Sequence, residues 1–422
     1  MPRHVSTSLA LLAAATLGFF SHCGSALADP AAEYARLYAA HDFFGLKAMA
    51  AADPRPDSEQ KRFYQAAVLT AFNQPAAANK LIEGMLANNI DTALMPFLLQ
   101  MRMQNDQRLY DYAGALDTER TLIDLYERKG DSRLADAQNT AKLLGALSGI
   151  DPQKVTRSGD SHIIEAADGK LGYCIPVTVG VDPCYILDSG ANYSTLIRSE
   201  AERLKLKIIP AGIQVGSSTS NVVTADVAVA PSLLLGNLQY HNVVFLVMPD
   251  SAFTFPGFQI PGILGFPISA GMGAVTVRHG HVIDVPKLVS GRRVDNIALD
   301  GNDILTDVIV NGHDVLCRVD TGADHTVFYK PYYDLYKDEV DKAGKPHTTK
   351  QGGAGGIKTY ATQRLPKLQI TVAGRRVSLT NVDVFTGKVV DSDYLQCNLG
   401  QDAFKDYRSY TINMAAMSLT LD

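Results

Sequence analysis

The chain has 422 residues, which is more than one ordinary domain and predicts two or three. Its 46% hydrophobic and 20% charged residues indicate a globular protein with a large core, and exclude a disordered or fibrous one. The formal net charge of −5 offers no basic field, so neither nucleic acid nor an anionic membrane surface is expected as a partner.

Residues 1–28 are predicted to be a secretory signal peptide. Arg3 and His4 precede an apolar run at residues 9–20, and Ala26-Leu27-Ala28 supplies the pattern of small residues expected before a cleavage site. The run is too short to span a bilayer comfortably, so no stable membrane insertion is expected after cleavage. The prediction is therefore a bacterial periplasmic or secreted protein. A lipid anchor at Cys23 is the alternative, although His22 fits such a site poorly.

Residues 29–150 are predicted to form a helical domain, because they are rich in Ala and Leu and carry apolar residues at helical spacing. Helices are expected at residues 63–71, 75–86, 109–115, 116–126 and 132–147. Short helix pairs of this kind resemble tetratricopeptide-type repeats. Two roles stay open for this region: binding a protein partner, or packing against the domain that follows.

A linker is predicted near residues 151–160, and β-strands dominate after it. The expected strands are short and rich in β-branched residues, and turn-forming residues separate them. They are placed at residues 175–179, 185–187, 222–229, 243–248, 275–277, 307–310 and 315–319, with Asn311-Gly312 as a hairpin turn.

One motif occurs twice in this β-rich region: an apolar strand followed by Asp, Ser or Thr, Gly and Ala. The first copy is Asp188-Ser189-Gly190 and the second is Asp320-Thr321-Gly322. The strand delivers the carboxylate to its end, and the glycine allows a sharp turn there.

A second landmark, a glycine directly preceded by leucine, follows each motif. Gly265 lies 77 residues after Asp188, and Gly400 lies 80 residues after Asp320. The near-equal intervals predict two copies of one fold, at residues 165–290 and 297–422.

Glycine- and serine-rich stretches lie between the landmarks of each copy, at residues 216–218 and 352–356. Flanked by strands, such stretches suit mobile hairpins that close over a cleft. The candidate flap residues are Gly216, Ser217, Gly353 and Gly355.

Four cysteines follow the predicted signal peptide, and an even number in an exported protein permits two disulfides. Pairing Cys174 with Cys184, and Cys317 with Cys397, keeps each disulfide within one copy. Four buried free thiols are the alternative.

Taken together, the duplicated motifs resemble aspartic proteases of the pepsin/retropepsin clan over residues 165–422. The segment 320–324, Asp-Thr-Gly-Ala-Asp, is similar to the retropepsin motif, whereas two copies in one chain resemble pepsin. The resemblance implies a mainly β, two-lobed protease fold with pseudo-twofold symmetry, here preceded by the helical domain. It implies an aspartic endopeptidase that acts on peptide or protein substrates without a metal or cofactor.

The resemblance also implies residue roles. Asp188 and Asp320 would form the catalytic pair, in which two close carboxyls share one proton and activate a water molecule. The hydroxyls of Ser189 and Thr321 would lock the two loops together. The backbone N–H groups of Gly190 and Gly322 would donate to the carboxylates.

The sequence departs from the family pattern at two places, and each departure predicts a property of the site. Ala191 and Ala323 stand where pepsin-type enzymes usually have a hydroxyl that supports the ionised carboxylate, which predicts a mild optimum of about pH 4 to 6.5. Asn192 stands where the second copy has Asp324, so the two halves of the cleft are not expected to be equivalent.

Two rival functions remain open at this stage. The same cleft can belong to a catalytically silent peptide-binding protein, since a fold does not guarantee activity. Alternatively, the chain is a scaffold whose helical layer recruits partners while the β region is structural.

Overall fold

The computed structural model describes residues 30–88, 90–164, 174–176, 184–217, 219, 221–278 and 282–422. The predicted signal peptide, the end of the strand expected at residues 175–179 and part of the first flap stretch lie outside these residues. The chain divides into two compact units, Met1–Ala141 and Lys142–Asp422. Among the described residues, no helix has the length and apolar character needed to cross a membrane.

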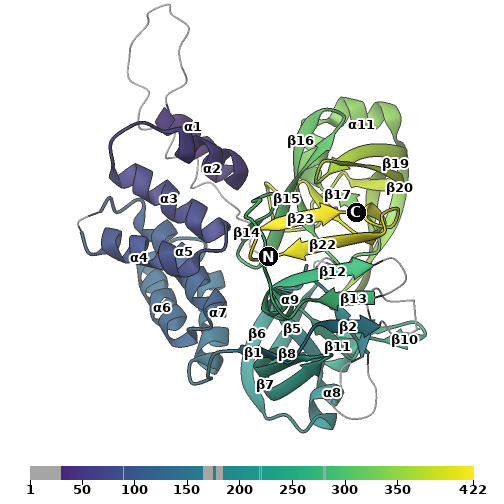
Figure 1. The fold of residues 1–422 in the computed structure, drawn as a ribbon, viewed down its shortest axis with the longest axis horizontal. Helices are drawn as coiled ribbons and strands as arrows, with labels where there is room; N and C mark the ends of the chain where they lie inside the picture. The colour runs from purple at the N-terminus through teal and green to yellow at the C-terminus, as the bar shows by residue number, and fades with distance from the viewer. Residues whose placement is uncertain are drawn as a thin grey trace, which may run out of the picture. The chain divides into compact units, whose positions relative to one another are not determined.

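The first unit is helical, and among its first six helices each packs on the next along the chain (Figure 1). Three of these helices begin at a side chain that accepts from a free backbone N–H: Asp42, Ser58 and Asp111. The helices are α1 Pro30–Ala39, α2 Phe43–Ala52, α3 Glu59–Ala71, α4 Pro75–Leu86, α5 Met95–Arg108, α6 Tyr112–Lys129 and α7 Leu134–Leu147, the last of which runs into the second unit.

The helix pair expected at residues 109–115 and 116–126 is wrong, because one long helix, α6, occupies this region. Tyr110 takes a left-handed backbone conformation with φ 60°, and the Asp111 carboxylate accepts from the Gly114 N–H, so the helix begins there. Helix α5 was not predicted as an element. It buries the polar Asn105 and Asp106 beside its apolar residues, which obscures its helical period in the sequence.

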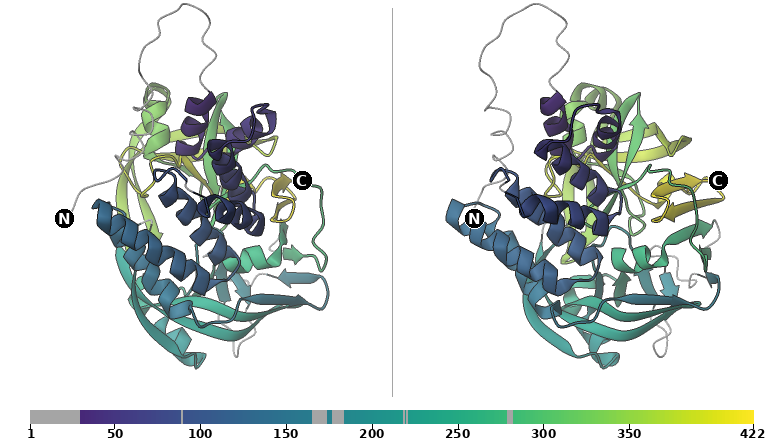
Figure 2. Two further views of the ribbon diagram at one scale, coloured as in Figure 1. Left: turned by 90° about the vertical axis from the view of Figure 1, so that its left-hand side faces the viewer. Right: turned by 60° about the vertical axis from the view of Figure 1, so that its left-hand side comes forward.

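The second unit is rich in β-structure, and its first sheet has the strand order β3-β4-β11-β5-β8-β7-β6, with β1 beside β8. The strands predicted at residues 185–187, 222–229 and 243–248 are confirmed and lie within β4, β7 and β8. The strands of this first sheet, drawn in teal, form a strongly twisted layer in both views of Figure 2. The bounds are β1 Lys154–Arg157, β3 Cys174–Pro176, β4 Cys184–Leu187, β5 Ser194–Ile197, β6 Ile208–Gly216, β7 Val222–Leu235, β8 Leu238–Met248 and β11 Gly262–Leu264.

The second sheet repeats this plan, with the order β14-β15-β16-β21-β17-β20-β19-β18. Strands β4 and β11 run parallel in the first sheet, as do β16 and β21 in the second. Two further parallel pairs also correspond, β5 with β8 and β17 with β20. The bounds are β14 Ala298–Asp300, β15 Asp303–Val310, β16 His313–Val319, β17 Val327–Phe328, β18 Lys345–Gly353, β19 Gly356–Val372, β20 Arg375–Phe385 and β21 Cys397–Leu399.

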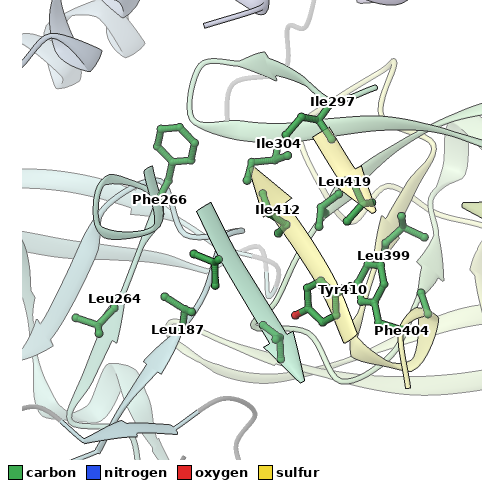
Figure 3. Packing of buried hydrophobic residues seen from close by; sticks show 14 of the residues in the cluster. Leu187, Leu264, Phe266, Ile297, Ile304, Leu399, Phe404, Tyr410, Ile412 and Leu419 are labelled. Carbon is green, nitrogen blue, oxygen red and sulfur yellow. The ribbon is translucent and has the colours of Figure 1, made fainter. Parts of the chain in front are cut away.

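A third sheet, of order β2-β13-β12-β22-β23, joins strands from both predicted copies. Its bounds are β2 Ser161–Ile164, β12 Ala274–Arg278, β13 Val282–Val285, β22 Ser409–Asn413 and β23 Ser418–Leu421. One buried cluster runs through all three sheets; Figure 3 shows Leu187 and Leu264 of the first sheet, Leu399 of the second and Ile412 of the third. Further short elements are α8 Arg198–Arg203, α9 Phe266–Met272, α10 Lys330–Leu335, α11 Lys337–Ala343, the hairpin β9 Thr254–Phe255 with β10 Phe258–Gln259, and the 3-10 helices Asp250–Phe253 and Gln401–Ala403.

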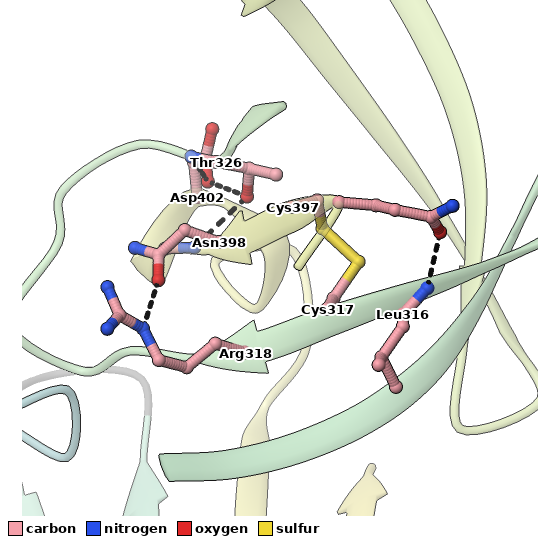
Figure 4. The surroundings of a disulfide bond; sticks show 9 residues. Leu316, Cys317, Arg318, Thr326, Cys397, Asn398 and Asp402 are labelled. Atoms are coloured by element: carbon pink, nitrogen blue, oxygen red, sulfur yellow. Dashed lines mark hydrogen bonds between the residues drawn. A yellow bond between two sulfur atoms is a disulfide. The ribbon is translucent and has the colours of Figure 1, made fainter. Parts of the chain in front are cut away.

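The cysteines of the second copy are not free thiols, because a disulfide joins Cys317 to Cys397 (Figure 4). This pair lies in register on the parallel strands β16 and β21. Cys184 is also disulfide-bonded. The alternative of four free thiols is therefore wrong.

Replacing both Cys317 and Cys397 with alanine is expected to lower the free energy of unfolding by about 2–4 kcal/mol. The disulfide spans 80 residues of sequence, and its loss lets the unfolded chain explore more conformations. Urea denaturation of the β-rich unit measures this change. Equal stability of the double variant and the parent would contradict it.

Candidate active site

Asp188 and Asp320 occupy matching places in the two sheets. Asp188 directly follows β4 and Asp320 directly follows β16. The backbone N–H of Asp188 donates to the Leu264 carbonyl oxygen at 3.0 Å, and that of Asp320 donates to the Leu399 carbonyl oxygen at 3.0 Å. The parallel neighbours β11 and β21 therefore hold the two aspartates at the ends of their strands.

Four hydrogen bonds connect the two loops reciprocally. The hydroxyl of Ser189 donates to the Val319 carbonyl oxygen, and that of Thr321 donates to the Leu187 carbonyl oxygen, both at 2.9 Å. Each hydroxyl oxygen also accepts the backbone N–H of the other residue at 3.0 Å. Both side chains are buried, so these bonds are shielded from water and hold the loops together.

Each glycine of the motif lies close to both aspartates, the one in its own loop and the one in the opposite loop. Gly190 N–H donates to Asp188 at 2.8 Å and Gly322 N–H donates to Asp320 at 2.9 Å. A Cβ built on Gly190 would lie 2.6 Å from Asp320 Cγ, and one built on Gly322 would collide with Asp188. Only glycine lets the two carboxyl groups approach in this way.

The electrostatics of the pair follow from this closeness. Burial raises the pKa of Asp188, and the negative charge of Asp320 raises it further, while Arg318 acts in the opposite direction. Two carboxyls so close do not both ionise readily, because each negative charge disfavours the other. The arrangement is suited to simultaneous acid and base chemistry.

The landmark glycines Gly265 and Gly400 lie close against the backbones of the two loops. A Cβ on Gly265 would lie 2.6 Å from the Ala191 carbonyl oxygen, and one on Gly400 would lie 2.8 Å from the Ala323 carbonyl oxygen. The two alanines offer the carboxylates no hydroxyl. At the next position the first loop has Asn192 and the second has Asp324, both exposed, so the two halves differ there by a titratable carboxyl.

The predicted flap residues lie at the tips of two hairpins, β6–β7 and β18–β19. Gly216 ends β6, Gly353 ends β18, and Gly355 takes a φ of 87° in the second turn. The tips contact each other, since the Ser217 hydroxyl donates to the Ala354 carbonyl oxygen at 2.6 Å. Thr219 and Asn221 add donations to Ala354 and Gly355 at 3.0 and 2.8 Å. The structure thus brings together segments more than 130 residues apart.

Two polar residues beside Asp320 were given no role in the sequence analysis. Asn398 donates its side-chain N–H to Asp320 at 2.8 Å. Arg318 donates to Asn398 at 2.7 Å, as Figure 4 shows. The signal was present, because Arg318 lies two residues before Asp320 and strand residues i and i+2 share a face. A charged residue at such a buried position indicates a polar neighbourhood.

Comparison with known proteins agrees with the first copy. Residues 178–268 match a family model described as aspartyl protease. The matched segment contains Asp188 and Gly265. No curated protein matches the chain. The chain therefore combines a helical region at residues 30–147 with a β-rich region that contains an aspartyl protease domain, and this domain supports a protease-type, hydrolytic function.

Proposed function

We propose that the protein is an aspartic endopeptidase in which Asp188 and Asp320 activate a water molecule against a peptide bond. The observation that carries the proposal is the reciprocal set of hydrogen bonds between Ser189 and Thr321. These bonds hold two carboxyl-bearing loops against each other, and a structural role alone does not need a second buried carboxyl group at the same point.

The proposed reaction needs one protonated and one ionised carboxyl. The ionised group accepts a proton from water as the water oxygen attacks the peptide carbonyl carbon, and the protonated group donates to the carbonyl oxygen. The resulting tetrahedral diol then loses the amine. The C–N bond breaks as the nitrogen takes the proton of the protonated carboxyl, and one diol hydroxyl gives its proton to the other carboxylate as the new C=O bond forms, which restores one proton to the pair.

We also propose that residues 165–290 and 297–422 are the two lobes of a pseudo-twofold protease fold. The corresponding strand orders of the first two sheets and their corresponding parallel pairs support this assignment. The contacting tips of β6–β7 and β18–β19 fit two flaps that cover the cleft and open to admit substrate.

The dependence of kcat/KM on pH is expected to be bell-shaped, with an optimum at about pH 4 to 6.5. Activity falls at low pH when both carboxyls are protonated, because no base remains. It falls at high pH when both are ionised, because no acid remains. The raised pKa of Asp188 moves this alkaline loss to higher pH. Full activity at pH 2 with little at pH 5 would contradict the expectation.

Cleavage of a diverse peptide library by residues 29–422, from pH 3 to pH 8, tests the proposed activity. Cleavage at internal peptide bonds supports an endopeptidase. Peptide capture without cleavage over the whole range would instead favour the silent binding protein. If the parent is inert, repeating the assay with residues 151–422 tells whether the helical region prevents cleavage.

We further propose that the protein is exported to the periplasm or the exterior and that its helical unit, as a tetratricopeptide-like layer, binds a protein partner. The predicted signal peptide supports export, and the Cys317–Cys397 disulfide is compatible with an oxidising compartment. Cell fractionation tests the location. Loss of partner capture on deletion of residues 29–150, with peptide cleavage retained, would support the recruiting role.

A further inference from the structure

The two aspartates receive equal support from the backbone but unequal support from side chains. Each carboxylate accepts the N–H of the glycine two residues later, at 2.8 Å for Asp188 and 2.9 Å for Asp320. Asp320 additionally accepts a side-chain N–H from Asn398 at 2.8 Å, and Asn398 is only 4% exposed. A donor held in a buried site stabilises the ionised form of the carboxyl that accepts from it.

Arg318 determines which end of the Asn398 amide faces Asp320. Its Nε donates to Asn398 Oδ1 at 2.7 Å (Figure 4). A guanidinium group has donors only, so it requires the amide oxygen on its own side and leaves the amide N–H₂ for the carboxylate. Arg318 Nη2 also lies 3.6 Å from Asp320 Oδ2, which places a positive charge beside the same oxygen.

Other charged and titratable groups share this neighbourhood. Arg318 Nη1 lies 3.5 Å from Asp303 on β15. Asp188 and Tyr329 also interact electrostatically with Arg318, and Asp303 and Tyr329 interact with Asp320. Despite the cost of burial, Tyr329 and the three carboxylates raise the pKa of Arg318, so the guanidinium stays charged. Asp320 therefore faces a permanent cation through both a direct contact and an oriented amide.

The first copy has apolar residues at the corresponding positions. Ile186 lies two residues before Asp188, and Ile263 lies two residues before Gly265. They are paired in register on the parallel strands β4 and β11, as Arg318 and Asn398 are paired on β16 and β21. Two isoleucines have no donor for a carboxylate, so the asymmetry of the pair arises from these two strand positions.

We propose that Arg318 and Asn398 are positioning residues that keep Asp320 as the ionised member of the pair, while Asp188 carries the shared proton. In the reaction, Asp320 is then the base that takes a proton from water, and Asp188 is the acid that donates to the substrate carbonyl oxygen. These catalytic roles depend on the endopeptidase proposed above, whereas the order of ionisation is a property of the protein without substrate.

Carbon-13 NMR of the full-length protein with labelled aspartate carboxyl carbons measures this order directly. The Asp188→Asn and Asp320→Asn variants assign the two resonances. Asp320 is expected to ionise at lower pH than Asp188. In Asn398→Ile, which copies the first-copy residue Ile263, the midpoint of Asp320 is expected to rise by about one pH unit or more.

Two further variants guard against a misfolded Asn398→Ile protein. Arg318→Met removes the cation and is expected to raise the Asp320 midpoint in the same direction. Ile263→Asn gives Asp188 an amide neighbour and is expected to lower its midpoint. Arg203→Met serves as the matched control: it also removes one arginine charge, from a pair with Glu200 at 2.6 Å, and is expected to leave both midpoints unchanged.

The outcomes separate this inference from the proposed activity. Ionisation of Asp188 before Asp320 in the parent would overturn the inference, as would unchanged midpoints in folded Asn398→Ile and Arg318→Met proteins. The expected order in a protein that cleaves no peptide would uphold the inference and refute the endopeptidase. In an active enzyme, Asn398→Ile is expected to move the acidic limb of kcat/KM upward by the shift that NMR measures.

Discussion

Replacing either Asp188 or Asp320 with asparagine is expected to lower kcat/KM for peptide cleavage by at least about a thousandfold. An amide neither accepts a proton from the attacking water nor donates one to the carbonyl oxygen in its place. The change is nearly isosteric, and an asparagine oxygen still accepts from the N–H of Gly190 or Gly322. Steady-state kinetics at about pH 5 on the library's best peptide measures the effect.

The matched control is Asp334→Asn, which neutralises an exposed aspartate that pairs with Lys330. It is expected to keep the parent's activity. Thermal unfolding shows whether the other two variants remain folded. Cleavage at the parent's rate by folded Asp188→Asn or Asp320→Asn would remove the pair from the reaction. If the parent only binds peptides, and both variants keep its affinity, the protein is a binding module.

Replacing Thr321 with valine is expected to lower the free energy of unfolding by about 2–6 kcal/mol and to reduce activity with it. The hydroxyl donates to the Leu187 carbonyl oxygen and accepts the Ser189 N–H. Valine has nearly the same shape, so the change leaves both partners buried without a hydrogen bond, at about 1–3 kcal/mol for each unsatisfied group. Urea denaturation measures the stability and peptide cleavage measures the activity.

The Thr321→Ser variant distinguishes the contribution of the hydroxyl to stability from that of the methyl group. It is expected to stay within about 1.5 kcal/mol of the parent, because it loses one buried methyl group and keeps both hydrogen bonds. The first loop already performs the same contacts with Ser189. If the valine variant is as stable as the serine variant, the reciprocal hydrogen bonds do not hold the loops together.

Local sequence patterns were enough to predict several elements of the fold. The strands β7, β8 and β16 were predicted because they are rich in β-branched residues and turn residues separate them from the next strands. The helical region was predicted from its apolar period, yet α5 was missed because buried Asn105 and Asp106 break that period. Asn105 donates to Thr70 and Asp106 accepts from Asn79, both in other helices, and no local pattern reveals such partners.

In the candidate site, too, local motifs were predictable from the sequence, whereas contacts between distant segments were not. The two Asp-Ser/Thr-Gly motifs were visible in the sequence, because each is a contiguous run with its own turn chemistry. Asn398 lies 78 residues from the aspartate to which it donates. Its relation to Asp320 depends on the parallel pairing of β21 with β16, which no short segment specifies.

The sequence by itself determined the division into a helical and a β-rich region, the duplication of the aspartate motif and the residue types of the two loops. Only the tertiary structure decided that Asp320 has Arg318 and Asn398 as neighbours while the corresponding first-copy positions are Ile186 and Ile263 in register. The physical reason is that strand register and chain closure bring distant segments together. The charge state of a buried carboxyl depends on those neighbours rather than on the adjacent residues in the chain.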